Sequence, residues 1–261
     1  MRMEEKVSKI YDKLSNFESK NSHRSAYPVH KKIQFQNPAI KNIYQWIIKN
    51  ISLAQNPKIL DAGCGVGYGS TLLADHYNAK VKGLSLSQKE IQHAKAYLQE
   101  KKHLQVEFVV SSYDELTQEK FDLIVAIESL KHAPNLAYTI ERLDKHLHEG
   151  GTLFIADDFW EGKQIGKLEQ QLKEDWALYQ LYKKQDYLPK GKAWEIQEHN
   201  MTALVSQKSS LAKELYYKYL LHISPNKAID NIFRGGLALE QLFKKGRMSY
   251  GFLICKKSPQ Q

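Results

Sequence analysis

The sequence has few cysteines and no long apolar run. Its two cysteines, Cys64 and Cys255, are too few for a disulfide framework or a cysteine-based metal cage. The longest apolar stretches, such as FDLIVAI from Phe121, are too short to cross a bilayer. The start, MRMEEKVSKIYDKL, carries charges where a secretory signal needs an apolar stretch, so we expect a cytoplasmic protein. With 42% hydrophobic residues, the chain has the composition of a globular protein with a sizeable core.

Charge is distributed unevenly along the chain, whose formal net charge is +9. Basic residues outnumber acidic residues by 10 to 4 in residues 1–56 and by 17 to 11 in residues 158–261. Residues 57–157 instead carry 11 basic and 14 acidic side chains. Basic flanks predict a positive field suited to an anionic small molecule, an acidic carrier or nucleic acid. Surface lysines that only keep the protein soluble would give the same counts, and composition leaves both interpretations open.

Apolar stretches of strand length alternate with helical patterns in the middle of the chain. The strand candidates are residues 58–61, 80–84, 106–110, 121–127 and 152–156, and the helical candidates are 69–77, 88–101 and 135–147. This alternation predicts an α/β protein with a doubly wound, parallel sheet.

The flanks have mainly helical patterns. Apolar residues recur every three or four positions between residues 4 and 17, which predicts an amphipathic helix. Asn37-Pro38 resembles the cap and first turn of a helix that runs to about Ile51. After Asp157 the pattern predicts a helical segment at 163–187, a possible strand at 194–199, more helix at 202–221 and a last strand, GFLICKK. The Gly235-Gly236 pair predicts a turn.

The stretch ILDAGCGVGYGS, residues 59–70, follows the first predicted strand and contains four glycines. Glycines at this point let the backbone approach a ligand at the carboxyl end of the sheet. A dinucleotide site would show G-x-G-x-x-G, but Tyr68 or Ser70 stands where the third glycine belongs. Asp61 would repel a pyrophosphate, whereas it would attract a ligand with an ammonium and a sulfonium group.

The motif DAGCGVG, residues 61–67, resembles the first motif of class I S-adenosylmethionine-dependent methyltransferases. VKGLSLS from Val81, SSYDEL from Ser111 and AIESLKHAPN from Ala126 are similar to motifs of the branch that includes the sterol, tocopherol, cyclopropane fatty acid and prenyl diphosphate C-methyltransferases. EGGTLFIADD from Glu149 resembles the fifth strand of the superfamily. The resemblance covers residues 40–158 closely and the tail loosely.

This resemblance implies a Rossmann-like, doubly wound sheet of seven strands, mostly parallel with the last strand antiparallel. A helical lid from the N-terminus and the C-terminal third would cover it. We therefore expect an N-terminal lid segment over residues 1–36 and a methyltransferase domain over 37–261. Within that domain we expect a cofactor-binding core at 57–157, substrate-side helices at 158–247 and a final strand at 250–256.

The resemblance also implies the residues that bind S-adenosylmethionine and its product, S-adenosylhomocysteine. The glycine loop would contact the methionine part of the cofactor and Asp61 its amino group. Most class I enzymes hold the ribose with an acidic residue at the end of the second strand, where this chain has Ser85, so we assign the ribose to Ser85 and Glu90. Glu90 could instead be a solvated residue that stabilises the start of its helix. The complete predicted set is Asp61, Gly63, Cys64, Gly65, Ser85, Leu86, Glu90, Ser112, Tyr113 and Ile127.

Two residues after the fourth predicted strand are candidates for catalysis. Methyl transfer mainly requires alignment and exclusion of water, and a base is needed only if the acceptor loses a proton. Glu128 and His132 could each accept that proton. In the sterol enzymes the corresponding glutamate is thought to help an alkene accept a methyl group and then lose a proton. Alternatively, Glu128 would only contact the cofactor and His132 would only cap the next helix.

Aromatic residues in the flanks suggest an apolar substrate pocket beneath the lid. If the acceptor is an alkene, aromatic faces can stabilise the cation that forms. The candidates are Tyr27, Phe35, Phe159, Trp160, Trp176 and Tyr179, although helical spacing would also place several of them in a core. An apolar pocket with a basic rim favours an anionic isoprenoid such as a prenyl diphosphate.

Other functions remain possible at this point. O- or N-methylation of another small metabolite would use the same cofactor site. Nucleic-acid methylation would suit the basic flanks, but Glu128-Ser129-Leu130-Lys131 does not resemble the Asn- or Asp-Pro-Pro-aromatic motif of base amino-methylases. A cofactor-binding protein without transferase activity would also keep these motifs. Asp157-Asp158 lacks a convincing third ligand, so we predict no metal. The short apolar stretches predict no membrane span. The oligomeric state stays open.

Overall fold

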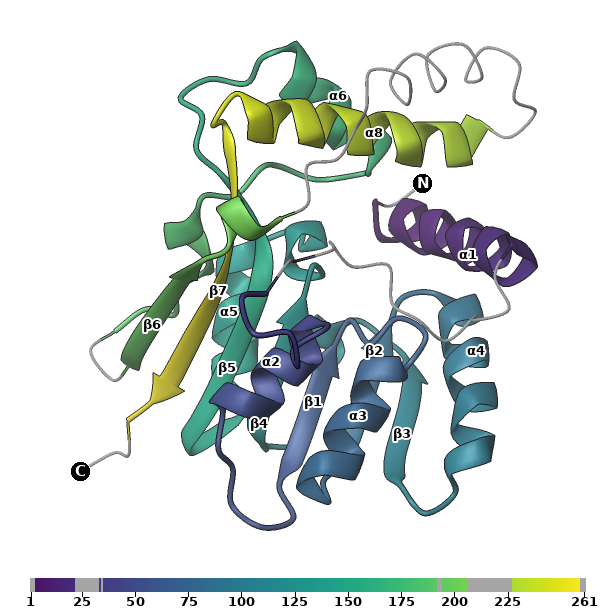
Figure 1. Cartoon of the computed structure of the whole chain (residues 1–261), viewed down its shortest axis with the longest axis vertical. Helices are drawn as coiled ribbons and strands as arrows, with labels where there is room; N and C mark the ends of the chain where they lie inside the picture. Colours follow the sequence, from purple (N-terminus) through teal and green to yellow (C-terminus); the bar gives the residue numbers. More distant parts are fainter. Residues whose placement is uncertain (1–2, 22–32, 34, 192–193, 206–226, 259–261) are drawn as a thin grey trace.

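The computed structural model describes residues 3–21, 33, 35–191, 194–205 and 227–258 (Figure 1). Seven strands form one sheet in the order β3-β2-β1-β4-β5-β7-β6. The strands are β1 (Lys58–Ala62), β2 (Lys80–Ser85), β3 (Gln105–Val110), β4 (Phe121–Ile127), β5 (Leu147–Trp160), β6 (Trp194–Asn200) and β7 (Met248–Lys257). Strands β1 to β5 pair in parallel, and β7 runs antiparallel to both β5 and β6. The expected doubly wound sheet with an antiparallel last strand is confirmed.

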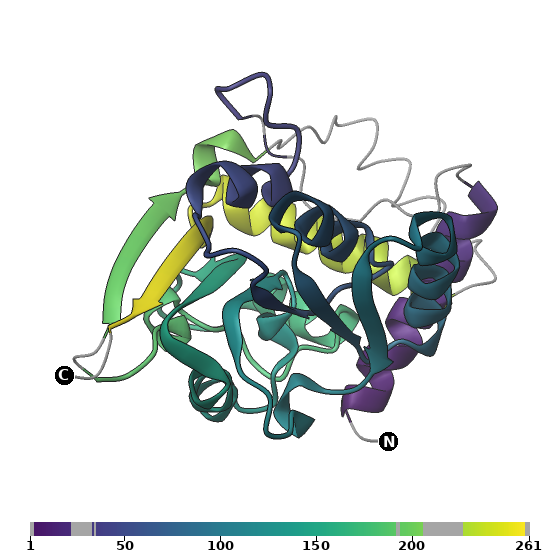
Figure 2. The same cartoon turned by 90° about the horizontal axis from the view of Figure 1, so that it is seen from below.

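Helices cover both faces of the sheet and one end of it. The helices are α1 (Met3–Asn21), α2 (Ile43–Asn50), α3 (Tyr68–Tyr77), α4 (Gln88–Leu98), α5 (Leu136–Lys145), α6 (Lys167–Asp175) and α8 (Lys227–Lys244). Short 3-10 turns are η1 (Gln99–Lys101), η2 (Tyr113–Glu115), η3 (Leu130–His132), η4 (Lys184–Tyr187) and η5 (Thr202–Leu204). Helices α1, α6 and α8 lie above the carboxyl ends of the parallel strands (Figure 1). Figure 2 shows β6 and β7 at one edge of the molecule and α1 beside α4 at the other.

The central strands are buried on both faces because helices pack on each side. Strand β4 reads FDLIVAI, and every residue except Asp122 is buried, as expected for a parallel strand between two helical layers. One core joins the sheet to α2 and α3, with Tyr44 and Ile47 fully buried, and the other joins it to α5. Strand order reverses between β1 and β4, which places the ligand-binding crevice of such a sheet at their carboxyl ends.

Two helical predictions differ from the structure. Asn37 and Pro38 form a turn, and α2 begins later, where the Asn42 side chain accepts a hydrogen bond from the Gln45 backbone N–H at 2.9 Å. The segment predicted as one helix at 163–187 contains α6 and η4, separated by a loop in which Ala177 has a φ of +51°.

The turn predicted at Gly235-Gly236 is also wrong, because both glycines lie inside α8. A Cβ atom on Gly235 would lie 2.4 Å from Cδ1 of Trp176. The glycine therefore serves close packing between α8 and the end of α6. Most of the helix predicted at 202–221 lies outside the described residues.

Gly69→Ala is expected to destabilise the protein by roughly 1–3 kcal/mol, because an added methyl group overpacks a filled core. Its Cβ would lie 1.8 Å from Cζ of Tyr44, whose side chain is only 1% exposed and cannot move aside. Thermal unfolding measures the effect. Gly236→Ala is the control, since its Cβ meets no atom closer than 4.0 Å, and alanine in a helix interior should raise stability. Equal melting temperatures for the two variants would contradict this prediction.

Candidate functional site

The glycine loop between β1 and α3 holds its backbone close to neighbouring segments. The backbone N–H groups of Gly63 and Cys64 both donate to the carbonyl of Leu84, at 3.0 and 2.8 Å. Gly63 has a φ of +114°, and a Cβ there would lie 2.4 Å from Cβ of Ser129. Only glycine combines this backbone angle with this contact, so Gly63 lets the loop pack against Ser129 at the carboxyl end of β1.

Asp61 lies beneath this loop and is fully buried. Its Oδ2 accepts hydrogen bonds from the hydroxyls of Ser70 at 2.7 Å and Tyr44 at 3.4 Å. Burial raises the pKa of Asp61 to about 6, although both hydrogen bonds oppose the shift. Its Oδ1 has no hydrogen-bond partner among the described residues. An unpartnered buried carboxylate oxygen next to an open loop suits a ligand that donates a hydrogen bond.

A cavity opens above the loop and encloses about 960 Å³ of space, including solvent at its mouth. This volume is at the upper end of the range for small-molecule sites. It is lined by eleven of the predicted cofactor and catalytic residues, namely Gly63, Cys64, Gly65, Ser85, Leu86, Glu90, Ser112, Tyr113, Ile127, Glu128 and His132. Asp61 lies below the lining. The cavity brings together residues from the ends of β1, β2, β3 and β4, as the switch point of the sheet requires.

The lining of the described part of the cavity contains two carboxylates, Glu90 and Glu128, and no lysine or arginine. His132 adds no positive charge, because burial and the nearby Lys131 lower its pKa to about 3. Such a lining favours a ligand that carries positive charge.

Glu90 lies at the first turn of α4, on the wall formed by the end of β2. It accepts a hydrogen bond from the Ser85 hydroxyl at 2.6 Å. Burial raises the pKa of Glu90 to about 7, with the Ser85 hydrogen bond acting in the opposite direction. The helix starts here because the Ser87 hydroxyl accepts a hydrogen bond from the Glu90 backbone N–H at 3.1 Å. Glu90 thus lines the cavity as expected for a ribose ligand, while it also lies in the first turn of its helix, so its role in ribose binding stays a prediction.

Helix α1 forms the roof of the cavity through Val7, Tyr11, Leu14 and Ser15. The spacing of the first three residues is that of one helical face, which is the signal in the sequence for this contact. The sequence predicted Val7, Tyr11 and Leu14 on the apolar face of a packing helix, but it did not assign them to the cavity.

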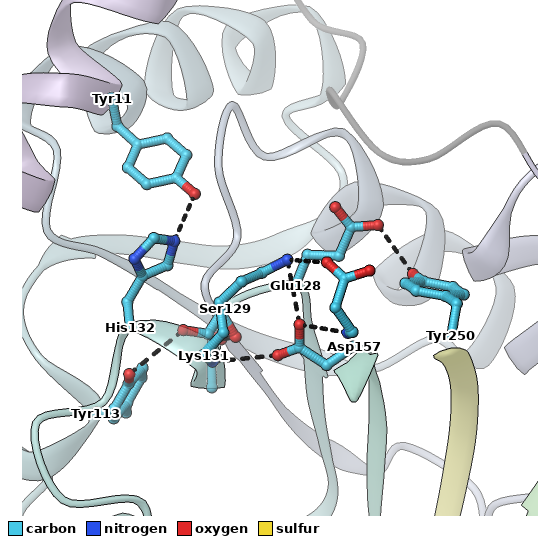
Figure 3. A network of polar contacts seen from close by, with 10 residues as sticks. Tyr11, Tyr113, Glu128, Ser129, Lys131, His132, Asp157 and Tyr250 are labelled. Carbon is cyan, nitrogen blue, oxygen red and sulfur yellow. Dashed lines mark hydrogen bonds and ion pairs between the residues drawn. The ribbon is translucent and has the colours of Figure 1, made fainter. Parts of the chain in front are cut away.

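Hydrogen bonds attach the roof to the segments below it. The Ser8 hydroxyl donates to the Leu86 carbonyl at 2.8 Å, and Asp12 accepts from the Ser87 hydroxyl at 2.6 Å. The hydroxyl of Tyr11 lies 2.9 Å from Nε2 of His132 (Figure 3). His132 does not cap the next helix, because the N-cap of α5 is Asn135. It contacts the roof helix instead.

Glu128 follows β4 with a φ of +52°, an angle that residues other than glycine seldom adopt. Its backbone N–H donates to the Ala156 carbonyl at 2.7 Å. The Tyr250 hydroxyl, from β7, donates to Oε1 of Glu128 at 2.9 Å (Figure 3). Backbone strain of this kind costs about 1–3 kcal/mol and is typical of functional sites.

A buried ion cluster lies next to Glu128 and was not predicted from the sequence. Nζ of Lys131 lies 3.2 Å from Oδ1 of Asp157 and 2.8 Å from Oδ2 of Asp158 (Figure 3). The Lys131 backbone N–H also donates to Asp157, at 3.1 Å. All three residues are less than 10% exposed. A lysine four residues after a strand gives no sign that its charge will be buried, so no sequence pattern indicated this cluster.

The predicted substrate aromatics lie elsewhere. None of Phe35, Phe159, Trp160, Trp176 and Tyr179 is among the residues that line the cavity. Phe159 is buried against Tyr187 and Phe35 packs on Phe252, so the two rings belong to the packing of the sheet. The Trp176 indole packs between α8 and Lys131. Tyr27 lies outside the described residues. The aromatic lining of the described cavity consists of Tyr11 and Tyr113.

The described residues contain neither a metal-binding cluster nor a membrane-spanning helix. No group of three or more His, Cys, Asp or Glu side chains among them could hold a metal ion. Within the same part of the chain, every helix is too short or too polar to cross a bilayer.

Comparison with curated proteins finds methyltransferases. The ubiquinone biosynthesis O-methyltransferase of Pelagibacter ubique is 32% identical over 136 residues, which cover 49% of this chain and 55% of that protein. The chloroplastic tocopherol O-methyltransferase of Arabidopsis thaliana is 27% identical over 225 residues, covering 77% and 63%. The chain spans about half the length of the first of these relatives.

Solved structures with the same fold cover nearly all of the chain. A geranyl diphosphate methyltransferase, in complex with geranyl diphosphate and sinefungin, matches with a TM-score of 0.72 at 15% identity over 98% of this chain and 99% of that chain. The geranyl diphosphate C-methyltransferase of Streptomyces coelicolor A3(2) matches with a TM-score of 0.70 at 14% identity over 98% of both chains. At these identities the likeness shows the fold alone.

The model of one protein family, described as the methyltransferase domain, matches residues 53–220. This match includes the glycine loop, the cavity walls formed by β2, β3 and β4, and the ion cluster behind Glu128. Since it spans more than half of the chain, the protein belongs to the methyltransferase domain family, within the class I S-adenosylmethionine-dependent enzymes.

Proposed function

We propose that the protein transfers the methyl group of S-adenosylmethionine to a carbon atom of an isoprenoid, with a prenyl diphosphate as the first acceptor to test. The observation that carries the proposal is the Glu128 carboxylate, held by Tyr250 at the wall of the cofactor cavity. A carbon that gains a methyl group must lose a proton, and a carboxylate fixed at this wall can accept it. The fold shared with two geranyl diphosphate methyltransferases supports the choice of acceptor.

The residues of the cavity fit S-adenosylmethionine. Gly63 and Gly65 line the cavity, and the space beside Gly65 is open, since a Cβ there would meet only Oε1 of Glu90, at 3.9 Å. The Oδ1 of Asp61 has no hydrogen-bond partner among the described residues. Glu90 and Ser85 would accept hydrogen bonds from the ribose hydroxyls, and Leu86, Ser112 and Tyr113 would surround the adenine. Cys64, Gly65 and Ile127 complete the contacts. When bound, this cofactor supplies a methyl group on a sulfonium, whose positive charge suits the acidic lining.

The remaining parts of the reaction belong to the chain's own side chains. Helix α1 excludes water from the cavity. The Glu128 carboxylate takes the proton from the carbon that has gained the methyl group, and the Tyr250 hydroxyl keeps this carboxylate in place. His132 is a weak base because its pKa is about 3, so its contact with Tyr11 serves to hold the roof closed. The head group of a diphosphate would lie outside the described lining, which offers it no cation.

A methyl-transfer assay with labelled cofactor tests the proposal. The acceptors are geranyl and farnesyl diphosphate, the two corresponding alcohols, and a phenol of the quinone-precursor type. We expect label in an isoprenoid product, with the new methyl group on carbon by NMR. Label on the phenolic oxygen alone would instead support O-methylation, the activity named for the two relatives above. Label in none of these acceptors would overturn the proposal.

Cofactor binding is expected to depend on pH through Glu90. The carboxylate must be ionised for both of its oxygens to accept hydrogen bonds from the ribose, and its pKa in the free protein is about 7. Affinity for S-adenosylhomocysteine should therefore rise about tenfold between pH 6 and pH 8. Calorimetry measures it. Asp61, with a pKa of about 6, titrates in the same range, so Glu90→Gln is the control that isolates the part due to Glu90. The same pH dependence in this variant would contradict the assignment.

A further inference from the structure

We propose that Tyr250 is a positioning residue that holds the carboxylate of Glu128 in its charged form and aims it at the cavity. The two residues are 122 positions apart in the sequence, and nothing in the motif around Glu128 indicates the contact. This inference rests on the proposed function, in which Glu128 accepts a proton.

The Tyr250 hydroxyl is fixed because its backbone is held from two sides. Its carbonyl accepts a hydrogen bond from the Met201 backbone N–H at 2.8 Å, and its own N–H donates to the Thr202 hydroxyl at 3.0 Å. Tyr250 pairs with Asp158 across β5 and β7. The position of Tyr250 is therefore set by β5, β7 and η5 together.

The ring of Tyr250 is equally constrained. The side chain is fully buried, and its ring meets that of Phe252 at 76° with the ring centres 6.2 Å apart. A tyrosine has two side-chain torsions, so a buried ring of this kind has little freedom to move its hydroxyl away. The hydroxyl thus offers a hydrogen at one place, 2.9 Å from Oε1 of Glu128.

Glu128 is held from its backbone as well. The left-handed φ of +52° and the hydrogen bond from its N–H to the Ala156 carbonyl fix the direction in which the side chain leaves β4. The Tyr250 hydroxyl then fixes one oxygen of the carboxylate, Oε1. The Glu128 side chain comes from the end of β4 and the Tyr250 side chain from β7, and the two meet in one hydrogen bond. Glu128 also lines the cavity.

Charged groups of both signs surround Glu128, so a neutral hydrogen-bond donor can stabilise its ionised form without adding charge. Burial, followed by the Glu128 charge, raises the pKa of Tyr250 well above its usual value, so the hydroxyl keeps its proton. Lys131 favours an ionised Glu128, but it is shared with Asp157 and Asp158, whose charges oppose ionisation. Among the described residues, the titratable groups that interact electrostatically with Glu128 include Tyr11 of α1, Tyr44 of α2, Lys131 of η3, Asp157 of β5 and Tyr250 of β7. Donation by Tyr250 stabilises the charged carboxylate without adding another charge.

Tyr250→Phe tests the inference because it removes the hydroxyl and keeps the ring. The protein is labelled with [5-13C]glutamate, and the Glu128 signal is assigned by its loss in Glu128→Gln. A hydrogen bond to a charged group favours ionisation, so the NMR titration midpoint of Glu128 should rise by about one pH unit in Tyr250→Phe. Tyr77→Phe is the matched control. It also removes a hydroxyl, one that donates to the Ile51 carbonyl at 2.7 Å, and it should leave the midpoint unchanged.

Kinetics provide the second measurement. With an acceptor from the assay above, Tyr250→Phe should lower kcat about tenfold at neutral pH, leave the KM of the cofactor unchanged and move the acidic limb of the kcat profile to higher pH. An unchanged titration midpoint would overturn the inference even if methyl transfer is found. A raised midpoint without methyl transfer to any acceptor would support the inference that Tyr250 holds Glu128 charged and overturn the proposed function.

Discussion

Lys131→Met is expected to lower the free energy of unfolding by about 3–5 kcal/mol, because removing one partner from a buried ion pair leaves uncompensated charge. Asp157 and Asp158 would remain in the core without their cation, which now lies 3.2 and 2.8 Å from them. For a domain of this size the melting temperature should fall by roughly 6–20 °C. Differential scanning calorimetry measures both quantities.

The pH dependence of this loss has a defined sign. Burial raises the pKa of Asp157 to about 6, and Lys131 opposes that shift. Without the lysine the pKa of Asp157 rises further, so the ionised form of this carboxyl is penalised in the folded state. The deficit of the variant should therefore grow as pH increases above about 6, where Asp157 is ionised in the wild-type protein but still partly protonated in the variant.

Two variants control the experiment on Lys131. Lys145→Met removes an exposed lysine paired with Glu141 at 2.6 Å and should leave the melting temperature nearly unchanged. Lys131→Met combined with Asp158→Asn removes one of the stranded charges and should recover part of the loss. If Lys131→Met melts at the same temperature as the Lys145 variant, the cluster is not the buried ion network described above.

Glu128→Gln is expected to lower kcat about 10²- to 10⁴-fold, the usual effect of removing a proton acceptor. Glutamine preserves the size of the side chain but cannot take a proton from the acceptor. Affinity for S-adenosylhomocysteine, measured by calorimetry, should change little. Single-turnover methyl transfer separates the chemical step from product release.

The matched control is Glu141→Gln, which makes the same change on the exposed face of α5 and should retain full activity. Wild-type turnover by Glu128→Gln would mean that Glu128 only contacts the cofactor. A large loss of cofactor affinity with normal turnover at saturation would lead to the same conclusion.

The sheet could be predicted because its signals are local. Apolar stretches such as FDLIVAI appear wherever a parallel strand is buried on both faces, and β4 is the strand at residues 121–127 as expected. The glycine loop could be predicted for the same reason, since the backbone at Gly63 excludes any side chain. Methyltransferase motifs then indicated which residues would surround the cavity at the ends of β1 to β4.

Helix ends and turns in the flanks were less predictable. Glycine at 235 indicates a turn when only its backbone preference is considered. In the structure it lies within α8 because the indole of Trp176 occupies the space where a Cβ would be. Trp176 is 59 residues away from Gly235 in the sequence, so no local pattern predicts this contact.

The sequence by itself determined the strands of the parallel sheet, the glycine loop and the family. These features depend on short-range periodicity and backbone conformation, which neighbouring residues set. Only the tertiary structure decided that Tyr11 reaches His132 and that Tyr250 donates to Glu128. It also placed Lys131 between Asp157 and Asp158, and it placed the flanking aromatics in packing contacts outside the cavity lining. These outcomes depend on which distant side chains share a buried space. Burial, and not residue type, turns an ordinary lysine or tyrosine into part of a site.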